Sequence, residues 1–134
     1  MMRHVLVVED EPSNATLMRK IFEKRTGSRV TVTDSPQEMF LRLRQEPVSL
    51  VVLDVSLGRS TWEGRSVDGI ELCRMIKDDP ATRNVPVILA TAHAMRGDAE
   101  RLLRDSGADD YVAKPILDHA DFVGRAVRLM ERAA

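Results

Sequence analysis

Carboxylates follow two apolar runs of this chain, at positions where a parallel sheet would bring them together. One run precedes Asp54, and the other spans residues 4–8 and is followed by Glu-Asp-Glu at residues 9–11. Unbroken, β-branched apolar runs are typical of strands buried on both faces of a parallel sheet. Because ligands bind outside the carboxyl ends of the strands in open α/β sheets, we expect these acids to share one crevice.

Several carboxylates in one crevice repel one another unless one takes up a proton or a cation is present. Mg²⁺ suits such a place, since it is bound through one or two carboxylates, waters and phosphate oxygens. Thr91 and Lys114 follow two further strand-like runs and are expected at the same edge. A metal beside Asp54 would neutralise an incoming phosphoryl group, whose other oxygens Lys114 and Thr91 could bind. The carboxylate of Asp54 would then be the nucleophile that forms an aspartyl phosphate.

Each of these residues also has an ordinary structural interpretation. Asp54 could cap a loop, and the acids at 9–11 could favour the positive N-terminus of the following helix. Thr91 could simply end a strand, and Lys114 could be solvated. Their joint placement at four strand ends is what favours a functional site.

The elements that must position these groups alternate along the chain. We expect strands at 4–8, 29–33, 48–53, 85–90 and 110–112, and helices at about 13–25, 36–46, 68–79, 95–106 and 118–131. Five strand–helix repeats predict an α/β fold with a five-stranded parallel sheet and helices on both faces. We expect one domain over residues 1–134, with an extended loop at about 57–67.

Composition is typical of a soluble globular protein, with 43% hydrophobic and 31% charged residues. A net charge of −1 provides no electrostatic signature of nucleic-acid binding. No signal peptide or membrane-spanning run is apparent, and Cys73 is predicted to be a buried thiol. We therefore expect a cytoplasmic protein with no direct nucleic-acid or membrane partner.

Five segments together resemble the receiver domain of two-component response regulators, over essentially the whole chain. They are VVEDEP at 7–12, LD at 53–54, DGIEL at 68–72, PVILATA at 86–92 and GADDYVAKP at 107–115. The stretch 91–98 is similar to single-domain receivers and to receivers attached to hybrid histidine kinases. The resemblance implies the flavodoxin-like, doubly wound (βα)5 fold with strand order 2-1-3-4-5.

The resemblance also implies the roles of the acids. Asp54 would accept a phosphoryl group from a histidine kinase or a histidine phosphotransfer protein. Asp10 would be a direct Mg²⁺ ligand together with Asp54, Glu9 would act mostly through water, and Ser56 would contribute its backbone carbonyl. Ser56 and His93 match two variable positions that tune dephosphorylation in relatives.

Four further residues match functional positions of the family. Lys114 matches its lysine, and the bond from Lys114 to Pro115 is expected to be cis. Thr91 matches the switch hydroxyl, and Tyr111 matches the switch aromatic that turns inward when the hydroxyl moves. Ala92 is small, as access to the acceptor requires.

The resemblance implies a switch rather than an enzyme, catalysing only its own phosphoryl transfer and dephosphorylation. The fourth helix, fifth strand and fifth helix would form the face that a downstream protein reads. We expect a monomer or weak dimer. We also expect no output domain behind the last helix.

One segment departs from the family pattern. Asp54 and Asp68 are 14 positions apart, and Leu57-Gly58 stands where relatives usually have Met-Pro before a shorter connection. One interpretation is a tolerated surface insertion, since long loops cost little closure entropy. The other is a lid over the crevice, or a partner contact anchored by Trp62, a residue type enriched at binding hot spots.

Three other functions compete with the switch. An Asp-nucleophile phosphatase would carry its nucleophile after the first strand, and a cap domain is not expected in this length. A flavin carrier would need a phosphate cradle after the first strand, where residues 9–11 are acidic. A non-phosphorylated pseudo-receiver that acts as a binding module stays open because of the altered loop.

Overall fold

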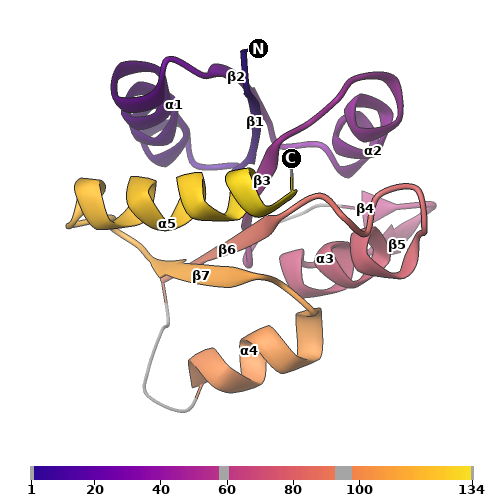
Figure 1. Ribbon diagram of the computed structural model, residues 1–134. Helices are drawn as coiled ribbons and strands as arrows, with labels where there is room; N and C mark the ends of the chain where they lie inside the picture. The colour runs from indigo at the N-terminus through magenta and orange to yellow at the C-terminus, as the bar shows by residue number, and fades with distance from the viewer. Residues whose placement is uncertain (1, 58–60, 93–97, 134) are drawn as a thin grey trace.

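The computed structural model describes residues 2–57, 61–92 and 98–133. Five parallel strands form its main sheet, namely β1 (His4–Val8), β2 (Arg29–Thr33), β3 (Leu50–Asp54), β6 (Val87–Thr91) and β7 (Asp110–Ala113). Their order is β2-β1-β3-β6-β7 (Figure 1). Strands β4 (Thr61–Trp62) and β5 (Arg65–Ser66) form a separate antiparallel pair and are counted in the chain-order numbering. The fourth and fifth strands of the sheet are therefore β6 and β7, in the positions that the predicted order gives them.

Helices cover both faces of the sheet. They are α1 (Pro12–Thr26), α2 (Pro36–Gln45), α3 (Gly69–Asp78), α4 (Asp98–Ser106) and α5 (His119–Ala133). One hydrophobic core joins the sheet to α1 and α5, and a second joins it to α2, α3 and α4 (Figure 1). This arrangement confirms the predicted flavodoxin-like α/β class. Among the residues described, no helix has the length and apolar character needed to span a membrane.

The two cores explain the unbroken apolar runs. Every residue of β1, β3 and β6 is buried, because each of these strands has helices on both faces. Phe22 of α1 meets Phe122 of α5 edge-on at 5.4 Å in one core, and Phe40 and Cys73 lie in the other. Burial of the central strands brings their carboxyl ends to one fixed edge.

Helix starts follow side-chain caps that the sequence signals. Ser35 accepts a hydrogen bond from the Glu38 N–H at the start of α2, and Asp68 does the same for Glu71 at the start of α3. Glu11 caps α1 by accepting from the N–H of Asn14. Of the three acids at 9–11, the third therefore serves the helix and the first two are left for the crevice.

Some element bounds differ from the predicted ones. The strand expected at 85–90 spans Val87–Thr91, because the N–H of Val85 donates to the carbonyl of Thr82 in a turn. The strand expected at 48–53 spans Leu50–Asp54. The helix expected from 95 is described from Asp98, since 93–97 lie outside the described residues.

The segment expected as a loop at 57–67 contains the hairpin β4–β5, which the sequence interpretation missed. Glu63 and Gly64 join the two strands with φ of 52° and 76°. Positive φ at both turn residues is the geometry of a tight two-residue hairpin turn. Leu57 and Val67, which flank the hairpin, are buried in the core beneath α2 and α3. The inserted segment is thus held at both ends.

Candidate functional site

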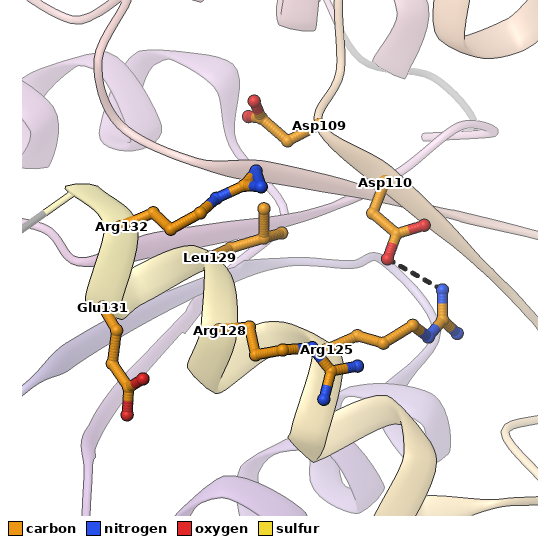
Figure 2. Close-up of a pocket in the computed structure, with 7 residues that line it drawn as sticks. All are labelled: Asp109, Asp110, Arg125, Arg128, Leu129, Glu131 and Arg132. Carbon is orange, nitrogen blue, oxygen red and sulfur yellow. Dashed lines mark hydrogen bonds and ion pairs between the residues drawn. The ribbon is translucent and has the colours of Figure 1, made fainter.

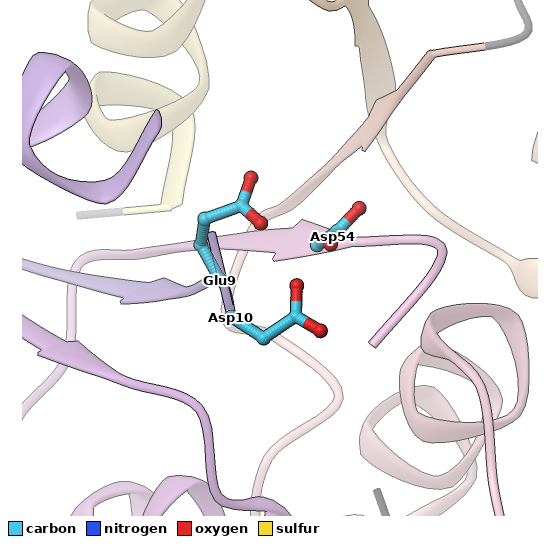
Figure 3. A group of neighbouring side chains, drawn as sticks. All are labelled: Glu9, Asp10 and Asp54. Carbon is cyan, nitrogen blue, oxygen red and sulfur yellow. The ribbon is translucent and has the colours of Figure 1, made fainter. Parts of the chain in front are cut away.

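Three carboxylates meet at the carboxyl ends of two neighbouring strands. Glu9 and Asp10 follow β1 directly, Asp54 is the last residue of β3, and β1 pairs with β3 in register up to Val8 and Leu53. One carboxylate oxygen from each acid lies within 4.8 Å of the others (Figure 3). Glu9 and Asp54 are buried, whereas Asp10 is exposed. The site therefore combines two carboxylates that are shielded from solvent with one that is exposed.

The side chain of Lys114, which follows the edge strand β7, completes the group of charged residues at this site. Its Nζ lies 2.9 Å from Asp54 Oδ1 and 3.0 Å from Glu9 Oε1. The lysine directly follows β7, and its peptide bond to Pro115 is cis, as expected. Burial opposes the charge of Lys114, but its hydrogen bonds to Asp54 and Glu9 outweigh this effect and raise the pKa of the ammonium. Lys114 thus stays charged in the crevice.

The acids outnumber the cation that balances them. Burial is the main cause that raises the pKa of Glu9 to about 7, and the neighbouring carboxylate of Asp54 raises it further. The hydrogen bonds that Glu9 accepts from Lys114 and from the N–H of Glu11 act in the opposite direction. The geometry is that of an ion pair with Lys114, and burial beside Asp54 makes the charged form of Glu9 costly when no cation is bound.

The donor set fits a hard divalent cation. All three acids offer oxygen ligands, and one ammonium offsets only one of three negative charges when all three are ionised. Mg²⁺ prefers such ligands and commonly keeps several waters, which the exposed side of Asp10 allows. A bound cation would also favour the ionised form of Glu9. The residues present therefore suit Mg²⁺.

Backbone contacts hold the segment that follows Asp54 in place. The N–H of Ser56 donates to Asp54 Oδ1 at 3.2 Å, so Ser56 lies beside the acids, on the exposed rim. The N–H of Val55 donates to the carbonyl of Ala90 on β6, and the carbonyl of Val55 accepts from the N–H of Gly69, both at 2.9 Å. The segment after Asp54 is therefore clamped between β6 and α3.

Thr91, Ala92 and Tyr111 lie on the strands that border the acids. Thr91 ends β6 and is buried, and its carbonyl accepts from the N–H of Lys114 at 2.8 Å. Ala92 follows it and is exposed. Tyr111 lies on β7 opposite Leu89 and is partly buried against the core beneath α3 and α4. The structure thus links the Thr91 and Lys114 segments directly. His93 lies outside the described residues.

A hollow of about 630 Å³ between β7 and α5 lies at the other end of β7, away from the acids (Figure 2). Arg125 crosses it, with Nη1 2.8 Å from Asp110 Oδ2 and 2.9 Å from the Tyr111 carbonyl oxygen. These bonds fasten α5 to the strand that carries Tyr111. The hollow is therefore formed by the start of β7 and by α5, and it is separate from the carboxylate site.

One residue that positions the site was missed by sequence reasoning. A β-carbon on Gly69 would lie 2.1 Å from the carbonyl oxygen of Asp54. The available signal was the glycine at the first position of the helix, directly after the Asp68 cap. A glycine within a helical pattern often indicates a close packing contact. The role of Gly69 is to let α3 approach the backbone of Asp54 and Val55 closely.

Comparison with known proteins places this site among signalling proteins. A family model described as the response regulator receiver domain matches residues 5–126. The polar-differentiation response regulator DivK of Brucella ovis is 35% identical over 116 residues, which cover 87% of each chain. The signal transduction histidine-protein kinase BarA of Shigella flexneri is 37% identical over 112 residues, which cover 84% of this chain. The match spans only 11% of BarA.

A solved structure that contains a metal ion is also similar to this chain. The receiver domain of the sensor histidine kinase PA1611 from Pseudomonas aeruginosa PAO1 is described with a magnesium ion coordinated in its active site cleft. It superposes with a TM-score of 0.80 at 27% identity, over 98% of this chain and 99% of that one.

Proposed function

Because this chain belongs to the response regulator receiver domain family, we propose that it is a switch of two-component signalling whose phosphoryl acceptor is Asp54. The observation that carries the proposal is the contact of Asp54 with Lys114 at 2.9 Å, beside the carboxylates of Glu9 and Asp10. A buried carboxylate with a fixed ammonium and two neighbouring acids has the groups that phosphoryl transfer requires.

Glu9, Asp10 and Asp54 would hold Mg²⁺ in this proposal, with the backbone carbonyl of Ser56 as a further ligand. The crowding of the three acids and the magnesium ion in the PA1611 receiver support this assignment. When bound, the metal supplies positive charge beside the incoming phosphoryl oxygens.

In the transfer step, a carboxylate oxygen of Asp54 attacks the phosphorus atom of the donor. A new oxygen–phosphorus bond forms while the bond from phosphorus to the donor's imidazole nitrogen breaks, and its electron pair stays on that nitrogen. Lys114 orients the carboxylate and binds a phosphoryl oxygen, and the Thr91 hydroxyl binds another. The small side chain of Ala92, which is exposed, leaves the approach to Asp54 open.

The partners in this proposal are proteins on both sides of the signal. A histidine kinase or histidine phosphotransfer protein supplies the phosphoryl group, and a downstream protein reads the face formed by α4, β7 and α5. The new charge at Asp54 draws Thr91 inward, and Tyr111 follows into the space that the threonine leaves. The bond from Lys114 N–H to the Thr91 carbonyl supports this route, since it joins β6 to the end of β7.

The test is intact mass after incubation with acetyl phosphate and Mg²⁺. The parent should gain one phosphoryl group, and the gain should vanish with EDTA and in Asp54→Asn. The matched control is Asp78→Asn, which removes an exposed carboxylate at the end of α3 and should be phosphorylated like the parent.

A folded parent that gains no phosphoryl group would contradict the proposal and favour the pseudo-receiver. When phosphorylation does occur, backbone amide shifts in α4, β7 and α5 should change on NMR spectra. Changes confined to the surroundings of Asp54 would contradict the proposed output face.

A further inference from the structure

The inserted hairpin is fixed to α2. The ring of Trp62 lies 4.6 Å from the ring of Phe40, centre to centre, with an angle of 48° between the planes. Phe40 is only 8% exposed, so Trp62 packs on a side chain that belongs to the core. Aromatic pairs in this range add to the energy of burial. The tryptophan is therefore an ordered part of the surface of α2.

Trp62 borders a groove of about 810 Å³ that runs along α2. On the helix side, Gln37, Leu41 and Gln45 line it at intervals of four residues, which places them on one helical stripe. Leu41 is 49% exposed, which makes it one of the few large hydrophobic side chains that the described part of the chain leaves in solvent. The groove thus has an apolar centre made of Leu41 and Trp62, with amides at both ends.

The charges of the groove leave one cation without a partner. Arg42 forms ion pairs with Glu38 at 3.6 Å and with Glu46 at 3.0 Å, and each of these acids is four residues away along the chain. Arg44 also lines the groove, and it has no ion pair or hydrogen bond with any residue that the structure describes. An occupant that carries carboxylates beside its apolar side chains would complement this surface.

We propose that the groove binds an amphipathic helix of a partner protein, with leucine-like side chains on Leu41 and Trp62 and a carboxylate on Arg44. A helix suits the site because the stripe follows α2 over its 10 residues, about 15 Å. Helices commonly bind in grooves through residues spaced three or four apart. The surface is separate from the face of α4, β7 and α5, because α2 follows the edge strand β2 and β7 is the opposite edge. The proposal goes beyond phosphorylation of Asp54.

Fluorescence of Trp62 tests the proposal directly, because it is the only tryptophan of the chain. The probe is a synthetic helical peptide without tryptophan, with leucines four residues apart and glutamates flanking them. We expect a saturable change in Trp62 emission. Two peptides serve as controls, one with lysine for each glutamate and one with serine for each leucine, and each should bind at least ten-fold more weakly. Calorimetry measures the same affinities without relying on emission.

Variants on the protein side locate the binding. Leu41→Ser and Arg44→Glu should each weaken binding of the acidic peptide about ten-fold or more, and both positions are exposed, so the fold should persist. Arg101→Glu is the control, since it makes the same charge change on an exposed position of α4. Failure of the acidic peptide to bind would overturn the proposal. So would equal binding of all three peptides or undiminished binding to both variants. No phosphoryl donor is present, so the result is independent of the switch.

Discussion

Gly69 lies so close to Asp54 that no side chain fits between them. A β-carbon at position 69 would lie 2.1 Å from the Asp54 carbonyl oxygen and 2.8 Å from the Val55 Cα. The N–H of Gly69 also donates to the Val55 carbonyl at 2.9 Å. Since the obstructing atoms are backbone, they cannot rotate away as a flexible side chain would. The first residue of α3 therefore fixes the backbone that carries the Asp54 carboxylate.

We predict that Gly69→Ala lowers the free energy of unfolding by about 2–4 kcal/mol, because α3 must move away from β3. Urea denaturation measures the change. Gly124→Ala is the matched control, since a β-carbon there would meet only the end of the Arg128 side chain at 3.7 Å. In the interior of α5 that change should stabilise by about 0.5–1 kcal/mol. Equal midpoints for Gly69→Ala and the parent would contradict the close contact.

The sheet and its acidic edge could be predicted from the sequence because both depend on simple periodicity. Unbroken apolar runs are buried on both faces, and the polar residue after each run must then lie at the carboxyl edge, as Asp54 and Lys114 do. Periodicity alone could not separate Glu9 from Glu11, since both follow β1, and it was the resemblance to receiver domains that assigned Glu9 to the metal site. Only the geometry shows that Glu11 turns back to cap α1 while Glu9 reaches Lys114.

The hairpin and the role of Gly69 were harder to predict for a different reason. A two-residue hairpin is usually signalled by Asn-Gly or Asp-Gly, and Glu63-Gly64 between strands of two residues is a weak version of that signal. Its stability comes from the contact of Trp62 with Phe40, which is distant in sequence. The closeness of Gly69 to Asp54 is likewise a tertiary contact that no local pattern contains.

Metal binding should appear as stability that depends on Asp10. This acid is exposed and makes no hydrogen bond or ion pair with the described residues, so Asp10→Asn removes repulsion without removing a contact. Without metal, the variant should be at least as stable as the parent. Adding Mg²⁺ should raise the free energy of unfolding of the parent by about 1–3 kcal/mol at saturating concentrations, and that of Asp10→Asn by much less. Thermal unfolding with and without EDTA measures both effects.

Asp78→Asn controls for this experiment, because it removes a surface carboxylate remote from the acids and should keep the full response to Mg²⁺. The same response in Asp10→Asn as in the parent would show that the cation does not bind at Glu9, Asp10 and Asp54.

His4 should make the protein less stable in mild acid. Burial is the main cause that lowers the pKa of its imidazole below 6.5, and Arg29 lowers it further, with Arg42 acting in the same direction and Glu46 against them. The folded state therefore resists protonation that the unfolded state accepts. As pH falls below about 6.5, the unfolded state gains protons first, and the free energy of unfolding decreases.

His4→Gln removes this titration and retains a side chain that can reach the Thr31 hydroxyl, which lies 2.8 Å from His4 Nε2. The difference in urea midpoint between parent and variant should change between pH 7.5 and 5, with the parent losing more stability. Carboxylates titrate in both proteins and cancel in the difference. A difference that stays constant with pH would show that His4 binds protons equally in both states.

The thiol of Cys73 should be unreactive toward alkylating reagents in the folded protein. Cys73 is fully buried in the core between the sheet and α3, and burial raises the pKa of its thiol to about 12. Since the thiolate is the reactive form, both access and ionisation are suppressed at pH 8. Iodoacetamide should modify the native protein at least 100-fold more slowly than the protein in urea, as followed by intact mass. Cys73→Ser is the control and should gain no label in urea, because Cys73 is the only cysteine. Native labelling as fast as in urea would mean that α3 opens readily and would contradict its tight packing through Gly69 on Asp54.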